Sequence, residues 1–134
     1  MPPPPPSPRL AARRWLERAE RDLAAARLTL GAAPPLLEMA AYHAQQAAEK
    51  ALKGFLVRHG QAFPKVHDLV PLLAACRTID ARFGAFLAAA QALTPYATRF
   101  RYPDPGSPLE PPPAEAQQAV QFAEGIVRFV QQQL

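Results

Sequence analysis

Apolar residues recur every three or four positions between Arg9 and Leu30, which places them on one face of an α-helix. This face consists of Ala12, Leu16, Ala19, Leu23, Ala26 and Leu30, with Trp15 on its flank. Ser7 followed by Pro8 is typical of an N-cap with proline at the first helical position, and Gly31 ends the pattern. The sequence therefore predicts a first helix from about Arg9 to Leu30.

Further helical patterns follow along the chain. They cover about residues 36–59, 67–78, 81–93 and 113–134. Gly60 ends the second helix, and Asp68 and Asp80 are suited to cap the third and fourth. Residues 94–112 contain too many prolines for regular structure. No useful length alternates with the period of a strand, so the sequence predicts an all-α fold, an up-and-down bundle of four to five helices.

The 134 residues, of which 49% are hydrophobic and 19% charged, have the composition of a single domain. We expect residues 1–8 to form a disordered, proline-rich arm and residues 9–134 to form the bundle. No apolar run approaches the roughly 18 residues of a membrane span, and prolines stand where a signal peptide would be apolar. These features predict a cytoplasmic protein with no membrane association. The single cysteine, Cys76, excludes an internal disulfide and a zinc cluster, and we expect no metal and no cofactor.

Polar residues interrupt the alanine-rich segment 36–59 along one line. At about 100° per residue, Tyr42, Gln46, Glu49 and Lys53 fall within roughly 60°, opposite a face made mainly of alanines. Small side chains let another helix approach closely, so we expect the alanines to face the core and this polar stripe to face outwards. The stripe is then either a solvated surface with a Glu49–Lys53 ion pair, or a surface on which Tyr42, Gln46 and Lys53 contact a partner helix or a phosphate.

The stretch YATRFRYPD, residues 96–104, mixes arginines with aromatic residues. Arg99 and Arg101 alternate with Tyr96, Phe100 and Tyr102. This mixture suits stacking on a base combined with positive charge against a phosphate, and the net charge of +4 permits an anionic partner such as nucleic acid. It also suits simple packing of the connection across the bundle, with Asp104 paired to either arginine.

The segments AYHAQQAAEKALKGFL, HDLVPLL and RFRYPD occur in this order before the last helix. Together they resemble the HEPN domain family (higher eukaryote and prokaryote nucleotide-binding), from about Trp15 to Val130. The resemblance implies a helical bundle that is usually a homodimer, often encoded beside a small nucleotidyltransferase as a toxin and antitoxin pair. It also implies that many members are metal-independent ribonucleases, whose site pairs an arginine with a histidine four to six residues further on, across the dimer interface.

That ribonuclease spacing is absent, because none of His43, His59 and His67 follows an arginine at this interval. The nearest candidate pair is Arg58 with His67, which the intervening loop would have to bring together, and Arg99 is the alternative arginine. Metal-free RNA cleavage needs an imidazole that exchanges a proton with the 2′-hydroxyl and a cation near the phosphate. His67 equally suits a structural role ahead of the third helix, bonded to a backbone carbonyl of the loop.

The last helix carries two apolar ridges. The first consists of Ala116, Ala119, Ala123, Val127, Val130 and Leu134, and the second of Phe122, Ile126 and Phe129. Together they cover nearly half of the helix, which is more than one neighbour covers. We therefore expect a second chain or the proline-rich connection to cover the remainder, and the pattern favours a homodimer.

The leading hypothesis is a HEPN-type homodimer that partners a minimal nucleotidyltransferase, or binds nucleotide or RNA, or does both, in the manner of a toxin–antitoxin system. Its candidate contact residues are Tyr42, Gln46, Lys53, Arg99, Arg101 and Tyr102. Arg58 and His67 are the candidates for catalysis. The alternatives are an active metal-independent endoribonuclease toxin and a structural adaptor without a ligand.

Overall fold

The computed structural model describes residues 1–63 and 65–134, and within them the chain forms helices and no strand. The α-helices are α1 (Pro8–Leu30), α2 (Leu37–Arg58), α3 (Leu69–Ile79), α4 (Leu87–Leu93) and α5 (Pro113–Gln133). Two 3₁₀ helices flank α4, namely η1 (Ala81–Phe86) and η2 (Thr94–Ala97). The predicted all-α bundle is confirmed.

The caps read from the sequence are present at the predicted helix starts. The side chains of Ser7, Asp68 and Asp80 each accept a hydrogen bond from a backbone N–H two or three residues further on, at 3.0–3.2 Å. The side chain of Arg82 donates to Asp80 as well, and these hydrogen bonds hold the pKa of the Asp80 carboxyl below its ordinary value. The predicted fourth helix differs from expectation, because its first half is the 3₁₀ helix η1 and only its second half is α-helical.

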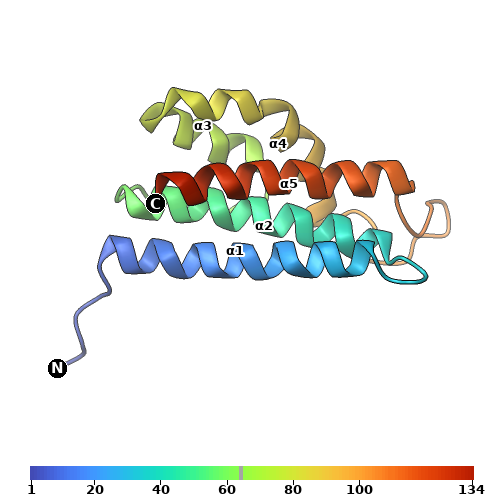
Figure 1. The fold of residues 1–134 in the computed structure, drawn as a ribbon, viewed down its shortest axis with the longest axis horizontal. Coiled ribbons are helices and arrows are strands. Elements are labelled where there is room, and N and C mark those ends of the chain that lie inside the picture. The colour runs from blue at the N-terminus through green and yellow to red at the C-terminus, as the bar shows by residue number, and fades with distance from the viewer. Residues whose placement is uncertain (64) are drawn as a thin grey trace.

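Three long helices run along the length of the molecule (Figure 1). Helix α2 runs antiparallel to α1 along nearly its whole length, and α5 returns beside both of them. The shorter helices α3 and α4 lie together on one side of this layer, against α2 and α5. The connection from η2 to α5 loops over the end of the molecule at which α2 begins.

Close packing of α1 on α2 depends on small residues, as the alanine pattern predicted. The alanines on the inner face of α2 are fully buried, and so are Ala19 and Ala26 of α1. Gly54 marks the tightest approach, because a Cβ atom there would lie 3.0 Å from Cβ of Trp15 and 3.3 Å from the backbone oxygen of Ala12. A side chain at this position would force the two helices apart.

The second apolar ridge of α5 is covered in part from within the same chain. The ring of Phe129 lies 4.9 Å from that of Phe83 and 5.3 Å from that of Phe86, both in η1, and Ile126 is fully buried. Phe122 and Phe129 stay half-buried, and the expectation that a second chain or the proline-rich connection covers the remainder of the apolar face stays a prediction. The pattern could not show the contact with η1, because η1 packs here only through its position in the fold.

Cys76 is a core residue. It is fully buried and its thiol lies 3.6 Å from the backbone oxygen of Leu52. Burial raises the pKa of the Cys76 thiol to about 12, so the reactive thiolate is scarce at neutral pH.

The N-terminal segment before α1 lies on the surface. Residues 1–7 precede α1 and are exposed throughout, and their predicted disorder stays a prediction. In the part of the chain that the structure describes, no helix is long and apolar enough to cross a membrane.

Candidate nucleotide-binding cleft and the buried network beside it

Half of the polar stripe of α2 is buried, contrary to expectation. Glu49 and Lys53 are only 4% and 9% exposed, and the neighbouring Gln45 is fully buried, whereas Tyr42 and Gln46 are half-buried. The segment that follows α2, together with Trp15 of α1, covers the buried side chains. The alanines lie in the core as predicted, but α2 is a central helix that is covered on several sides.

Glu49 is the centre of a hydrogen-bonded group that we call the Glu49 network. One carboxylate oxygen accepts from Nδ1 of His67 at 3.0 Å and from the amide of Gln45 at 3.2 Å, and the other accepts from Nζ of Lys53 at 3.2 Å. Gln46 joins through its own amide, which donates to Oε1 of Gln45 at 2.7 Å. The carboxylate is thus fully engaged, as a buried charge requires.

The side chain of Lys53 is buried and is hardly accessible to a ligand. Its ammonium lies 5.9 Å from the ring centroid of Trp15 and 5.3 Å from that of Phe63, in addition to its bond with Glu49. The aromatic rings and the carboxylate together compensate for the loss of water around the charge. Lys53 therefore contributes to the Glu49 network, and little of it is accessible to a partner.

His67 occupies the outer edge of the network. The amide of Gln45 donates to its backbone oxygen at 2.9 Å, while its imidazole remains 66% exposed. Because an ionised carboxylate can only accept, the contact with Glu49 places a proton on Nδ1. This fixes the ring and leaves Nε2 without a hydrogen-bond partner among the residues that the structure describes. The partner of the imidazole is thus a carboxylate and not the loop carbonyl that the sequence suggested.

A cleft of about 370 Å³ lies where α2 begins, and we call it the Tyr42 cleft. It is lined by Glu38, Met39, Tyr42, His43, Arg99, Phe100, Arg101 and Leu109. The structure therefore brings together three residues that the sequence had placed in two separate motifs, namely Tyr42, Arg99 and Arg101. Tyr102, which is 77% exposed, lies next to them in the chain.

Both cleft arginines lie over aromatic rings. The guanidinium of Arg101 is 4.9 Å from the ring centroid of Tyr42 and 5.8 Å from that of Tyr102, and the guanidinium of Arg99 is 4.7 Å from that of Phe100. Such contacts orient an arginine without consuming its hydrogen-bond donors. The backbone of Phe100 has φ 68°, a left-handed conformation that a bulky residue rarely adopts, so the surrounding structure holds this segment in an unfavourable shape.

Neither cleft arginine is neutralised by a carboxylate in the described residues. Asp104, which the sequence allowed as a partner, instead accepts from the backbone N–H of Gly106 and from Ser107, and these bonds lower the pKa of its carboxyl. Glu38 lines the same cleft but forms no ion pair with Arg99 or Arg101. The two guanidiniums are therefore available to an anion.

One wall of the Tyr42 cleft is anchored to α1 through a contact that the sequence did not reveal. Nδ1 of His43 lies 3.0 Å from Oδ1 of Asp22, and the other oxygen of Asp22 pairs with Lys50. The ring of His43 meets that of Tyr42 edge to face at 5.3 Å. His43 and Lys50 are seven residues, or about two helical turns, apart and so lie on the same face of α2. This spacing is the feature of the sequence that agrees with their both binding Asp22.

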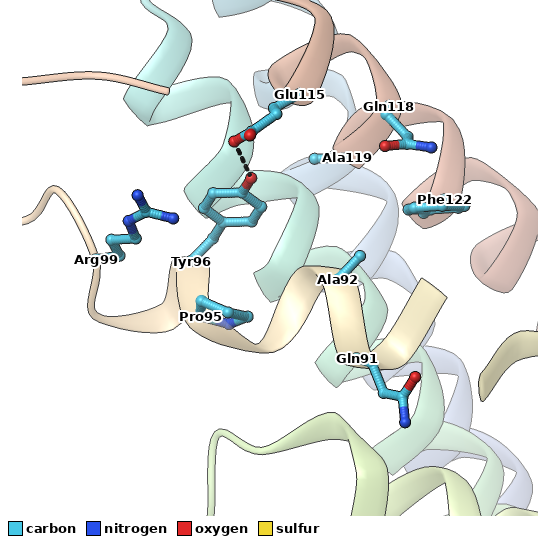
Figure 2. A pocket seen from close by; sticks show the side chains of 9 residues that line it. All are labelled: Gln91, Ala92, Pro95, Tyr96, Arg99, Glu115, Gln118, Ala119 and Phe122. Atoms are coloured by element: carbon cyan, nitrogen blue, oxygen red, sulfur yellow. Dashed lines mark hydrogen bonds between the residues drawn. The ribbon is translucent and has the colours of Figure 1, made fainter. Parts of the chain in front are cut away.

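A second hollow, of about 290 Å³, lies between η2 and α5 (Figure 2). There the hydroxyl of Tyr96 points from η2 towards α5 and donates to Glu115 at 3.2 Å. Burial is the main cause that raises the pKa of the Tyr96 hydroxyl, and the neighbouring carboxylate of Glu115 raises it further. This hollow contains one guanidinium, that of Arg99, and one carboxylate, that of Glu115, whereas the Tyr42 cleft contains two guanidiniums and one carboxylate. The hollow therefore suits an anion less well than the Tyr42 cleft does.

The HEPN domain family model matches residues 12–133, nearly the whole folded chain. The chain belongs to the HEPN domain family. Among solved structures, this HEPN chain is similar to TT1696 from Thermus thermophilus, with 36% identity, 92% of this chain and 98% of that chain covered, and a TM-score of 0.79. It is also similar to ST0689, an archaeal HEPN homologue, with 30% identity, coverage of 91% and 96%, and a TM-score of 0.73. Comparison with curated proteins finds no significant match.

This HEPN domain does not bring Arg58 and His67 together. Arg58 follows Glu49 by nine residues, about two and a half turns, and so lies on the opposite side of α2 from the carboxylate that holds His67. It lines a hollow with Arg13 and Glu17 of α1. The connecting loop includes Pro64, which lies outside the described residues. Within those residues, no group of histidine, cysteine and acidic side chains is arranged to hold a metal ion.

Proposed function

We propose that this HEPN protein binds a nucleotide, or one nucleotide of an RNA strand, in the Tyr42 cleft. The observation that carries the proposal is the pair of guanidiniums, Arg99 and Arg101, that share one cleft and lack a carboxylate partner among the described residues. Bases stack on arginine planes and aromatic rings, and phosphates bind guanidiniums in a bidentate manner. Arg101 and Tyr102 supply the stacking surface, and Arg99 supplies a second positive charge for the phosphate.

Titration calorimetry with uridine and adenosine monophosphates at low salt tests this binding. Arg101→Ala should weaken it by about 10- to 100-fold, since a hydrogen bond to a charged group contributes about 1.5–3 kcal/mol. Glu38→Gln should strengthen the binding, because it removes from the cleft a negative charge that repels the phosphate. Arg77→Ala, on α3, is the matched loss of one positive charge and should have little effect. No binding by the unaltered protein at low salt would overturn the proposal.

A second candidate, metal-independent RNA cleavage, is favoured by the geometry of His67. Its ring is oriented by Glu49 and exposes Nε2, as a general base requires. The expected result is cleavage of a generic RNA in the presence of a chelator, reduced at least 100-fold by His67→Ala but not by Arg58→Ala. Equal cleavage by the unaltered protein and the His67 variant would assign the activity to a contaminant.

We propose a homodimer and a minimal nucleotidyltransferase partner in a toxin–antitoxin arrangement, in the cytoplasm; family membership supports these statements. Two exposed apolar side chains that line the Tyr42 cleft, Met39 and Leu109, add a surface that a partner chain can cover.

A further inference from the structure

Positive charge is concentrated on α1. Between Pro8 and Leu30 there are six arginines and three acidic residues, so this one helix carries an excess of three positive charges, against a net charge of +4 for the whole chain.

Three of these arginines form one line on the outer side of α1. Arg14, Arg18 and Arg21 are all exposed and, at about 100° per residue, fall within an arc of roughly 60° on the side away from the buried Leu16 and Leu23. We call them the arginine ridge. From Arg14 to Arg21 the ridge extends about 10 Å along the helix.

The charge of the arginine ridge is not neutralised by ion pairs within the described residues. On α1, Asp22 directly follows the last arginine of the ridge, and it is already bound to Lys50 and His43. Glu17 and Glu20 lie on the same helix but pair with none of the three arginines, and the one α1 arginine that does form an ion pair is Arg27, with Glu124 of α5. The ridge therefore presents free guanidiniums to solvent.

One end of the arginine ridge lies next to a residue that contacts the Tyr42 cleft. Asp22, directly after Arg21, binds His43, which lines the cleft and touches Tyr42. Helix α1 lies alongside α2 (Figure 1), so this contact connects the ridge helix to the cleft. An extended ligand with a nucleotide in the cleft can reach the ridge by crossing this contact.

We infer that the arginine ridge binds the phosphates of a single-stranded polynucleotide whose terminal or flanking nucleotide occupies the Tyr42 cleft. This inference rests on the proposed function and makes the ligand a strand instead of a free nucleotide. Three guanidiniums spread over about 10 Å can each contact one phosphate of a strand that lies along α1. A cleft of 370 Å³ with exposed aromatic and guanidinium surfaces accepts an unpaired base, so a single strand fits better than a duplex.

The test compares uridine oligomers of one, three, six and ten nucleotides, each titrated at several salt concentrations. Affinity should rise with length, and the triple variant Arg14→Ala, Arg18→Ala, Arg21→Ala should remove this rise while leaving monophosphate binding unchanged. Neutralising three phosphates of a single strand contributes about 2 to the slope of log affinity against log salt. Between 50 and 200 mM salt, the unaltered protein should therefore lose roughly 20-fold more affinity than the triple variant.

The control removes the same charge elsewhere, by Arg13→Ala, Arg77→Ala and Arg128→Ala, and should keep the dependence on length. Circular dichroism checks that both triple variants stay helical. An unchanged salt slope in the ridge variant, or equal losses in both variants, would overturn the inference while the cleft proposal stands if monophosphate still binds. Length-dependent binding that the ridge variant loses, without monophosphate binding, would support the ridge and overturn the cleft. No binding of any oligomer would overturn both.

Discussion

Replacing Glu49 by alanine should lower the free energy of unfolding by about 3–5 kcal/mol, the cost of removing one partner from a buried ion pair. The ammonium of Lys53, 9% exposed, would lose its carboxylate, and the amide of Gln45 and the ring of His67 would each lose an acceptor. For a chain of 134 residues this corresponds to a fall in melting temperature of roughly 10–20 °C. Urea and thermal unfolding followed by circular dichroism measure both quantities.

The control for Glu49 is the double variant Glu49→Met with Lys53→Met. It removes both charges, and replacing a buried pair by apolar residues of similar volume is often neutral or stabilising. Most of the stability lost in Glu49→Ala should therefore return. If the double variant is as unstable as the single one, the shape of the site and not the charge of Lys53 is what Glu49 maintains. If Glu49→Ala is itself nearly neutral, the network does not stabilise the fold.

Replacing Phe83 by alanine should cost about 3–5 kcal/mol of unfolding free energy, as expected for deleting a buried aromatic ring. Phe83 is fully buried, and its ring centroid lies 4.6 Å from that of Phe55 on α2 and 4.9 Å from that of Phe129 on α5. The ring thus joins η1 to two of the long helices. Equilibrium unfolding in urea measures the loss.

The comparison variant is Leu87→Ala, at the start of α4, where the side chain is 43% exposed and the change should stay within about 1 kcal/mol. Equal losses in the two variants would mean that η1 does not pack as described.

Melting at two protein concentrations adds a test of the proposed homodimer, because a folded dimer melts at a temperature that rises with concentration. A melting temperature independent of concentration would remove the dimer proposal.

The helices themselves could be predicted from local signals. The caps at Ser7, Asp68 and Asp80 and the 3.6-residue periodicity act within a few residues of the chain, so they are legible without the rest of the fold. The same holds for the all-α class and for membership of the HEPN family, since ordered motifs carried the resemblance. The division into η1 and α4 was missed, because periodicity does not separate a 3₁₀ turn from an α-helix.

The candidate site was predicted only in its parts. Tyr42, Arg99 and Arg101 were each selected for their chemistry, but nothing in the sequence indicated that they share a cleft, since more than fifty residues separate Tyr42 from Arg99. Only the tertiary structure shows that Arg58 and His67 lie apart. His67 contacts Glu49 on one side of α2, whereas Arg58 lies on the other side, with residues of α1.

The sequence by itself determined where this protein forms helices and which of their faces are apolar, because those properties depend on neighbouring residues. Only the tertiary structure decided which polar faces are covered. A helical wheel shows that Glu49 and Lys53 lie opposite the alanines, but the wheel cannot show a third layer on that side. The loop after α2, together with Trp15, supplies this layer, and so converts a stripe expected on the surface into a buried network that is stable because every charge in it has a partner.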